Sequence, residues 1–566
     1  MVSTAASLLE GLDAEQRIAA DTLLGPLCLL AGAGTGKTRA ITHRIAYGVA
    51  TGVYAPDRVM ALTFTARAAA ELRGRLKTLG TIGVAARTFH ATALSQLGFF
   101  WPQVMGGTMP RILESKGRVL GQAAEMLKLK LDTPTLRDLA AEIEWRKVSQ
   151  LTPQQYAQIV ETRPLPSMLN AERMLALHDA YEAIKDARRQ IDFEDVLLAT
   201  AGMIEQEPRV AQHVREQYRF FVVDEYQDVS PLQQTLLDLW LGDRQDICVV
   251  GDASQTIYSF AGASADFLLG FSSRYSQATV VRLEQNYRST PAIVHTANRL
   301  MKSRAGALSL HASSRTPEAG ARAAAPSIEC FASDVAEARA VANRVAEQIS
   351  AGVKPQDIAI LYRINVQSAV LEAALTDANV SFQLRGGTRF FDQQEVKQAL
   401  MMLKGALVAA TNEPLFKTVS DVLRSLGWTQ QAPDAPGAVR ARWESLNAII
   451  ALAEEATETT TLRAFVDELF DRSASQLEPT MAAVTLATLH SAKGLEWECV
   501  HIIGLSEGLV PISYAKSAPA IDEERRLLYV GITRARRALH LSWASAGSGR
   551  GASRRASQFL PELAIP

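Results

Sequence analysis

The stretch Leu27–Thr38, which reads Leu-Cys-Leu-Leu-Ala-Gly-Ala-Gly-Thr-Gly-Lys-Thr, decides the fold of this chain. Its apolar beginning predicts a short buried parallel strand, and the glycines that follow have the spacing of a phosphate-binding loop. Such glycines let backbone N–H groups turn toward phosphate oxygens. A helix predicted from Thr38 to about Ala50 points its positive N-terminal dipole at the same anion. The stretch therefore predicts a nucleoside triphosphate site rather than a glycine-rich turn that binds nothing.

The loop and a second strand end supply the groups that hydrolysis needs. The loop residues expected around the phosphates are Ala31, Gly32, Ala33, Gly34, Thr35, Gly36, Lys37 and Thr38. Lys37 offers a positive charge to the β- and γ-phosphates, and the Thr38 hydroxyl is a predicted Mg²⁺ ligand. The apolar run Phe220–Val223 ends in Asp224, predicted to hold Mg²⁺, and Glu225, predicted to deprotonate the attacking water. The expected cofactors are thus ATP and Mg²⁺, although an acidic turn after a core strand is common on its own.

Composition limits the functional classes. A chain of 566 residues is too long for one hydrophobic core, so about three or four domains are expected. The 59 basic and 60 acidic residues give a net charge of −1, which excludes an overall polycation but allows a local basic groove. The four cysteines are scattered without a CxxC pair, which argues against a disulfide framework or a zinc module. We identify no membrane-spanning run and no signal peptide, and expect a cytoplasmic protein without membrane contact.

Strand and helix signals alternate along most of the chain, which predicts parallel α/β sheets. A short helix capped near Asp13 comes first, and a helix over residues 64–79 follows the second strand. The further strand signals lie at Val59–Thr63, Phe220–Val223, Ser327–Phe331, Ile358–Tyr362, Val380–Leu384, Cys499–Ile503 and Leu539–Trp543, and in runs that begin at Ile247 and Val484. Residues 91–190 and 390–483 show helical periodicity with few strand signals, which indicates two helical insertions.

Polar and aromatic residues follow the strand that begins at Ile247. Strand ends in α/β sheets face the ligand crevice, so Gln255 is expected to reach a γ-phosphate. Tyr258 and Phe260 offer faces for stacking bases, although composition alone favours core packing for both. The mixed-charge segment 522–537 is typical of a solvated helix face, yet it also carries the arginines that a phosphoryl-transfer site needs.

In their order along the chain, these motifs resemble superfamily 1 DNA helicases of the UvrD, Rep and PcrA group over essentially the whole length. The matching segments are Gln16, AGAGTGKT (31–38), LTFTARAAAELRGRL (62–76), TFH (88–90), IDFEDVLL (191–198), VDEYQDVSPLQ (223–233), GDASQTIYSF (251–260), LEQNYRST (283–290), LYRINVQS (361–368), TLHSAKGLEW (488–497) and RRLLYVGITRARRAL (525–539). The GLDAEQR start, the DASQTIYSFAGA stretch and RARWESL at 440–446 are most similar to a UvrD-like subgroup found in actinomycetes.

The resemblance implies an α/β fold with two RecA-like P-loop lobes, each a parallel sheet with flanking helices and each carrying a mostly helical insertion. The first lobe would comprise residues 1–90 and 191–279, with its insertion at 91–190. The second lobe would comprise residues 280–389 and 484–566, with a reduced insertion at 390–483.

The resemblance also assigns roles to individual residues. Contacts with the adenine are implied for Gln16, Arg39 and Tyr287, and a contact with the ribose for Glu496. Sensing of the γ-phosphate is implied for Gln255, Arg288 and Arg534, the two arginines from the second lobe. Single-stranded DNA would pass near Phe64, Thr88, His90, Tyr258, Phe260, Arg363, Thr488 and His490. For Tyr258 and Phe260 this replaces the core packing favoured by composition.

The function that the resemblance implies is an ATP-dependent 3′–5′ DNA helicase or translocase acting in DNA repair or recombination. Its partners would be single-stranded DNA, junctions of single- and double-stranded DNA, and proteins of those pathways. Three departures from the family pattern bear on this: Ala261 replaces a frequent arginine, the second insertion is small, and no further domain is expected after the core.

Three alternatives remain open at this stage. The small second insertion favours a translocase that displaces proteins with little unwinding. A P-loop kinase or GTPase would leave Tyr287-Arg288 and Thr533-Arg534 unexplained. A hydrolytically idle DNA clamp would not need Lys37.

Overall fold

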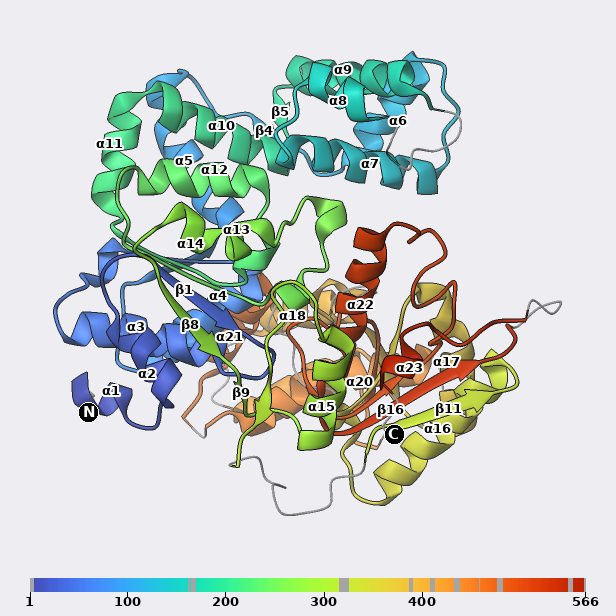
Figure 1. Cartoon of the computed structure of the whole chain (residues 1–566). Helices are drawn as coiled ribbons and strands as arrows, with labels where there is room; N and C mark the ends of the chain where they lie inside the picture. Colours follow the sequence, from blue (N-terminus) through green and yellow to red (C-terminus); the bar gives the residue numbers. More distant parts are fainter. Residues whose placement is uncertain are drawn as a thin grey trace. The chain divides into compact units, whose positions relative to one another are not determined.

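The computed structural model describes residues 5–160, 163, 169–314, 325–385, 390–407, 413–431, 438–457, 459–475, 482–547 and 553–563. The chain folds into two compact units, each built on its own parallel sheet (Figure 1). The first unit comprises Met1–Ala31 and Gly36–Leu283, and the second comprises Gly32–Thr35 and Glu284–Pro566. Among the described residues, no helix combines the length and the apolar character that crossing a membrane requires.

The sheet of the first unit has six parallel strands in the order β3-β2-β6-β7-β1-β8. They are β1 (Leu27–Ala31), β2 (Val59–Thr63), β3 (Ala85–Thr88), β6 (Phe220–Val223), β7 (Ile247–Gly251) and β8 (Thr279–Leu283). Every residue of β2, β6 and β7 is buried, as continuous apolar runs predict for strands covered on both faces. The predictions for these strands are confirmed.

The strand β8 was not predicted. It pairs with β1 from Leu27↔Thr279 to Ala31↔Leu283, so the first unit extends to Leu283 rather than ending at residue 279. The strand lies at the sheet edge, and Thr279, Val280 and Arg282 are exposed. The apolar run that marks the central strands is therefore missing from its sequence.

Helices cover both faces of this sheet. They are α1 (Ala5–Leu9), α2 (Ala14–Asp21), α3 (Lys37–Ala50), α4 (Ala66–Thr78), α5 (Phe89–Val104), α10 (Phe193–Gln206), α11 (Pro208–Gln217), α12 (Pro231–Leu241), α13 (Asp266–Leu269) and α14 (Phe271–Arg274). Successive residues of β1 point into different cores: Leu27 and Leu29 pack into one, and Cys28 packs into the other. The helix predicted from residue 64 begins two residues later, at Ala66.

The segment between α5 and α10 is mainly helical and has its own core, whereas α5, most of which lies within the range 91–190 expected for the first insertion, packs against the sheet. The segment contains α6 (Lys116–Met126), α7 (Thr133–Val148), α8 (Pro153–Ile159) and α9 (Ala171–Ala187), and the short strands β4 (Arg111–Ile112) and β5 (Gln190–Ile191) pair at its base.

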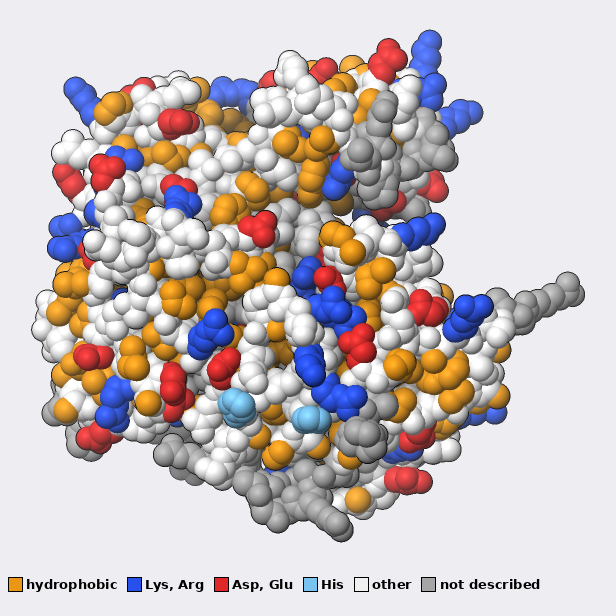
Figure 2. Space-filling view, in the orientation of Figure 1, with side chains coloured by type: hydrophobic (Ala, Val, Ile, Leu, Met, Phe, Trp, Pro, Cys, Tyr) orange, Lys and Arg blue, Asp and Glu red, His pale blue; other side chains and the backbone are white. Residues whose placement is uncertain are grey.

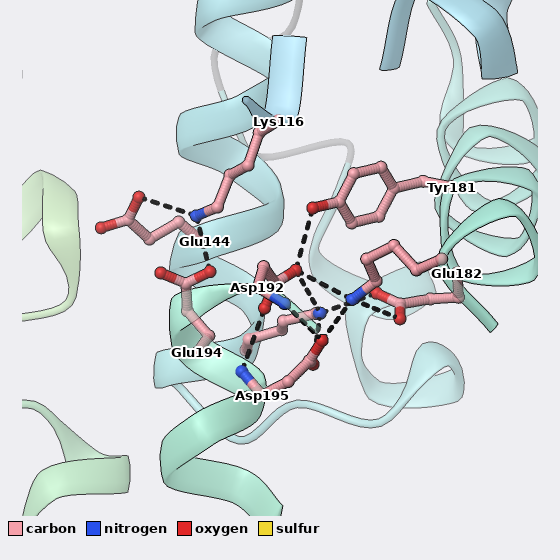
Figure 3. Close-up of polar contacts among 9 residues, drawn as sticks. Lys116, Glu144, Tyr181, Glu182, Asp192, Glu194 and Asp195 are labelled. Atoms are coloured by element: carbon pink, nitrogen blue, oxygen red, sulfur yellow. Dashed lines mark hydrogen bonds and ion pairs between the residues drawn. The ribbon is translucent and has the colours of Figure 1, made fainter. Parts of the chain in front are cut away.

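A buried ionic network joins the insertion to the start of α10 (Figure 3). The ammonium groups of Lys147 on α7 and Lys185 on α9 lie 2.8 and 2.9 Å from Oδ2 of Asp192, which caps α10. Burial alone would raise the pKa of Asp192, but the two lysines outweigh it and hold this pKa far below its usual value. The three carboxylates of Glu182, Asp192 and Asp195 lie as close together as the ligands of a metal ion. The ammonium groups of Lys147 and Lys185 contact all three of them.

The second unit repeats the architecture with a six-stranded parallel sheet in the order β11-β16-β15-β12-β14-β13. Its strands are β11 (Ser327–Phe331), β12 (Ile358–Tyr362), β13 (Phe382–Arg385), β14 (Val484–Thr488), β15 (Trp497–Ile502) and β16 (Ala535–Ala544). The flanking helices are α15 (Pro291–Met301), α16 (Asp334–Ser350), α17 (Ser368–Asp377), α22 (Ala518–Ile532) and α23 (Leu560–Leu563), with a separate pair of short strands, β9 (Gln285–Asn286) and β10 (His311–Ala312). All of the predicted strands of this unit are present.

The second insertion is also helical in its described part. It consists of α18 (Gln394–Ala406), α19 (Leu415–Ser425), α20 (Ala438–Glu455) and α21 (Leu462–Ser475) around one core. Residues 432–437, within the helix interruption expected from the sequence, lie outside the described residues.

Short 3₁₀ turns complete both units. They are Pro56–Arg58, Tyr226–Asp228, Ala253–Gln255, Ser259–Ala261, Pro355–Asp357, Asn365–Gln367 and Phe390–Asp392. Basic and acidic side chains are interspersed over the face seen in Figure 2, as a net charge of −1 leads one to expect.

Candidate nucleotide and DNA site

The phosphate-binding loop has the backbone geometry that its glycines permit. Gly34 and Gly36 have φ angles of 71° and 80°, in the left-handed region that side chains disfavour. A Cβ atom on Gly36 would lie 2.7 Å from Nε2 of Gln16, so the buried glutamine already covers this part of the loop. The helix α3 begins at Lys37, directly after the loop, so its positive N-terminal end lies beside the loop.

A hydrogen-bonded path leads from the loop lysine across three strand ends. Lys37 Nζ lies 3.4 Å from Oε1 of Glu225. Nε2 of Gln227 donates to Oε2 of Glu225 at 2.5 Å, and its Oε1 accepts the backbone N–H of Asp252 at 3.0 Å. Gln255 Nε2 in turn donates to Oδ2 of Asp252 at 2.8 Å. The structure thus brings together Lys37, Glu225 and Gln255, and adds two residues that the sequence did not single out.

The donor set beside this path fits a divalent cation. Burial raises the pKa of Asp224 to about 7, and the neighbouring Glu225 charge adds to the rise, whereas Lys37 opposes it. Two carboxyl groups therefore face one ammonium group, and an additional positive charge would relieve their repulsion. Asp224 and the Thr38 hydroxyl offer the hard oxygen ligands that Mg²⁺ prefers.

The candidate adenine contacts of the first unit lie beside the same loop. Asp13 caps α2 through a reciprocal pair of bonds with Gln16, which confirms the predicted cap. The exposed Arg39 donates from Nη2 to the carbonyl oxygen of Gly11 at 3.2 Å. Gln16 and Arg39 therefore flank the start of α3.

In the second unit, Glu496 is held between two arginines. Its Oε2 lies 2.5 Å from Nε of Arg288, and its Oε1 pairs with Arg536. Burial would raise the pKa of Glu496, but these two guanidinium groups lower it overall. Arg288 also donates from Nη1 to the carbonyl oxygen of Thr533 at 3.1 Å, next to Arg534.

Arg534 is buried, with 2% of its surface exposed. Its Nε donates to the carbonyl oxygen of Val530 at 2.8 Å, and its Nη1 donates to that of Leu495 at 3.1 Å. The guanidinium is thus fixed by the backbone at the end of α22 and by the residue that precedes Glu496. The candidate residues Arg288, Glu496 and Arg534 lie together.

Asn286 is a structural residue that the sequence analysis missed. It is 1% exposed, and its Nδ2 donates to the carbonyl oxygen of Ala33 at 2.7 Å. The backbone N–H of Tyr287 donates to the carbonyl oxygen of Gly34 at 2.8 Å. These bonds hold the loop tip, Gly32–Thr35, within the second unit. The signal was present in the LEQNYRST segment, but only its tyrosine and arginine were singled out.

Among the DNA candidates of the first unit, His90 lies beside an exposed aromatic residue, Phe193, which the sequence analysis did not single out. The ring of Phe193, 51% exposed, meets His90 edge-on with ring centroids 5.9 Å apart. Burial lowers the pKa of His90. Thr88 caps α5 by accepting the N–H of Ala91, and Phe64 packs partly against the core.

Tyr258 and Phe260 form a second aromatic pair, with ring centroids 6.1 Å apart. Phe260 is 59% exposed, so the expectation of core packing from composition is wrong for this residue. Burial raises the pKa of Tyr258 to about 12, and its ring is only partly accessible. Ala261 ends the same 3₁₀ turn.

One DNA candidate of the second unit, Arg363, belongs to a buried ion pair. Arg363 donates from Nη2 to Oε1 of Glu524 at 2.8 Å. Burial, together with the charges of Arg363 and Lys493, lowers the pKa of His490 to about 4. The hydroxyl of Thr488 shares a hydrogen bond with that of Ser491 at 2.5 Å and does not take part in the ion pair.

Comparison with known protein families identifies the chain. A model of the UvrD/REP helicase N-terminal domain matches residues 12–276, and a model of the UvrD-like helicase C-terminal domain matches residues 281–432 and 414–546. The chain belongs to the UvrD helicase family. Its two six-stranded parallel sheets with flanking helices are the RecA-like lobes of this family.

Individual relatives of the UvrD family match almost the whole chain. The ATP-dependent DNA helicase UvrD2 of Mycobacterium tuberculosis H37Rv is 46% identical over 98% of this chain and 82% of its own length. DNA helicase II of Escherichia coli K12 is 30% identical over 98% of this chain and 88% of its own length. PcrA of Bacillus subtilis is 29% identical over 98% of this chain and 86% of its own length. The resemblance to UvrD and PcrA, and to actinomycete members in particular, is confirmed.

Proposed function

We propose that this UvrD-family chain is an ATP-dependent 3′–5′ DNA helicase or translocase that couples ATP hydrolysis to movement on single-stranded DNA. The observation that carries the proposal is the bonded path from Lys37 through Glu225, Gln227 and Asp252 to Gln255. It connects the loop lysine to Glu225, the proposed general base, and to Gln255, the proposed phosphate sensor, at the same end of the sheet. The names of its relatives support ATP and DNA as the ligands.

In this proposal the loop N–H groups and Lys37 bind the phosphates, with Gln16, Arg39 and Tyr287 on the adenine. Thr38 and Asp224 would hold Mg²⁺, which neutralises phosphate charge when bound. Glu225 accepts the proton of the attacking water, and Gln227 fixes its carboxylate by donating a hydrogen bond.

The arginines of the second unit would stabilise the negative charge that develops on the γ-phosphate. Arg288 is paired with Glu496, and Arg534 with two carbonyl oxygens, so phosphate must compete with these partners. When Arg288 shares its charge with phosphate, Oε2 of Glu496 would become available for the proposed ribose contact, while Oε1 stays paired with Arg536. We also propose that the chain divides into two lobes and two insertions, as the resemblance to the family implies.

The proposed DNA path uses the residues already described, with stacking on Phe64, Tyr258 and Phe260. Stacking is worth about 1–3 kcal/mol per base, which holds a strand yet allows its release in each cycle. Hydrolysis removes the charge that attracts the arginines, and this change would drive release and recapture of the bases. The proposed substrates are single-stranded DNA and its junctions with duplex in repair or recombination.

A second candidate function is a translocase that displaces proteins but unwinds little. The observation that favours it is the length of the second insertion, expected at residues 390–483, whose described helices α18–α21 share one core. Unwinding of a tailed duplex, measured beside displacement of a protein bound to single-stranded DNA, separates the two candidates. Displacement without unwinding would favour the translocase.

The first test is ATP hydrolysis with and without single-stranded DNA, for the wild type, Glu225→Gln and the control Glu205→Gln. Glu205 is an exposed carboxylate on α10, so its replacement is expected to change nothing. We expect strong stimulation by DNA and a loss of about 10²–10⁴-fold in Glu225→Gln. Hydrolysis that is indifferent to DNA would refute the proposal.

A further inference from the structure

The second unit carries an exposed tyrosine on a turn whose first part is buried and whose last part is exposed. Tyr514 is 72% exposed, whereas Val510 and Ile512 of the same turn are 0% and 8% exposed. A single exposed apolar residue is common on a protein surface and means little alone. The hydrogen bonds that fix the turn of Tyr514, and the charged groups next to it, suggest a binding role for this exposed ring.

The turn that carries Tyr514 is fixed by hydrogen bonds. The N–H of Gly508 donates to the carbonyl oxygen of Pro511 at 3.0 Å, and that of Ala515 donates to the carbonyl oxygen of Ile512 at 2.9 Å. The N–H of Ile512 donates to Oε2 of Glu524 at 3.1 Å. The tyrosine is therefore held in place by its backbone, and a ligand would not have to order the turn on binding.

The same carboxylate anchors a candidate DNA residue. Glu524, 5% exposed, accepts Nε of Arg363 at 3.1 Å and Nη2 at 2.8 Å. Burial alone would lower the pKa of Arg363, but Glu524 and then Tyr514 raise it, which places the phenol within interaction range of the guanidinium. One buried carboxylate thus fixes both Arg363 and the turn of Tyr514.

A further cation lies near this ion pair. The charges of Arg363 and Lys493 both lower the pKa of His490, so each of the two lies near this histidine. An open aromatic ring beside cationic groups is the combination that binds unpaired nucleotides, because the ring stacks on a base while the cations attract phosphate.

We propose that Tyr514 is a further base-stacking residue for single-stranded DNA, and that Glu524 is the residue that positions it together with Arg363. This inference rests on the proposed function, since it adds a contact to the same DNA path. Tyr514 meets the base, and Glu524 acts only through the turn and the guanidinium.

Equilibrium binding of a fluorescent thymidine oligonucleotide tests the stacking contact. A second probe of equal length carries abasic sites and keeps the phosphates. We expect Tyr514→Ala to weaken binding of the thymidine strand about 5- to 100-fold and Tyr514→Phe to restore it, because the ring carries the contact. The control Phe416→Ala, at a 42% exposed phenylalanine on α19, should bind like the wild type.

The abasic strand separates stacking from other losses. On it, Tyr514→Ala and the wild type should bind equally, since no base remains to stack. Equal binding of the thymidine strand by both proteins, or the same loss on both strands, would overturn the inference. A wild type that binds neither strand would overturn the proposed function itself.

The positioning role of Glu524 has its own readout. Glu524→Gln should raise the DNA concentration for half-maximal ATP hydrolysis, and adding Tyr514→Ala should raise it by less than in the wild-type background, because the two act as a unit. Fully independent effects would refute the role of Glu524 in holding the tyrosine.

Discussion

Replacing Lys185 by methionine removes one of the two cations that pair with Asp192 at the start of α10. Lys185 is 1% exposed, and its ammonium group lies 2.9 Å from Asp192 and 2.8 Å from Glu182 and also contacts Asp195. Methionine keeps the length and the apolar stem of the side chain. The three carboxylates would then share the remaining ammonium group of Lys147.

The expected loss follows from the burial of these charges. Breaking a buried ion pair by removing one partner costs about 3–5 kcal/mol, because an uncompensated charge stays in the interior. Lys147 remains 2.8 Å from Asp192, and the Tyr181 hydroxyl still donates to it at 2.9 Å. We therefore expect a loss of ~3 kcal/mol in the local stability of the insertion, at the lower end of this range.

Amide hydrogen exchange of α9 and α10 measures this loss directly, because it reports opening of the insertion without requiring two-state unfolding of the whole chain. The control is Lys417→Met, whose ion pair with Glu413 at 2.6 Å is exposed, so its removal should leave hydrogen exchange of α9 and α10 unchanged. The low pKa of Asp192 adds stability above its unfolded value of 3.8, and this contribution is lost as the pH falls through the folded value. A loss below about 1 kcal/mol in Lys185→Met would refute the reasoning.

Three further substitutions test the loop, the base and a buried histidine. Gly34→Ala should weaken ATP binding about tenfold in a titration with a fluorescent analogue, because its Cβ would lie 2.6 Å from Nδ2 of Asn286 at a φ of 71°. Gln227→Leu removes the 2.5 Å bond to Glu225 and should lower kcat about 10- to 100-fold with little change in the KM for ATP. Burial lowers the pKa of His178 from 6.5 to about 3, so stability is lost as the pH falls below 6.5 and the unfolded chain alone takes up the proton. Between pH 6.5 and 5, hydrogen exchange should show the wild type losing about 2 kcal/mol of stability that His178→Phe does not lose. The same pH dependence in both proteins would contradict this prediction.

The central strands were predictable because burial on both faces leaves a direct mark on the sequence. The strands β2 and β6 have the predicted bounds, since each is an unbroken apolar run. The edge strand β8 has three exposed residues, and its pairing with β1 depends on a partner distant in the sequence. The cap formed by Asp13 was predictable for the opposite reason, since it involves only neighbouring residues.

The candidate site divides in the same way. The residue types of the loop and of Glu225 follow from local spacing, so the sequence indicated both. The distant partners do not follow from local spacing: Asn286 holds the loop through Ala33, 253 residues away, and Arg363 and Glu524 are 161 residues apart. Exposure is equally hidden, because Phe193 is exposed although the fold buries Asp192 and Glu194 on either side of it. Sequence patterns name the chemical groups, and the tertiary structure decides which of them meet.

The helix α22 shows why the groups of the second unit cannot move independently. Glu524 lies within this helix, and Arg534 follows its end, about 15 Å further along at 1.5 Å per residue. Between them, Leu527, Leu528 and Val530 are almost fully buried, and Val530 also accepts the bond from Nε of Arg534. A packed helix moves as a rigid element rather than bending at each residue. The arginine proposed for the γ-phosphate and the carboxylate proposed to position Tyr514 therefore share one support, so that a displacement of either one is felt by the other.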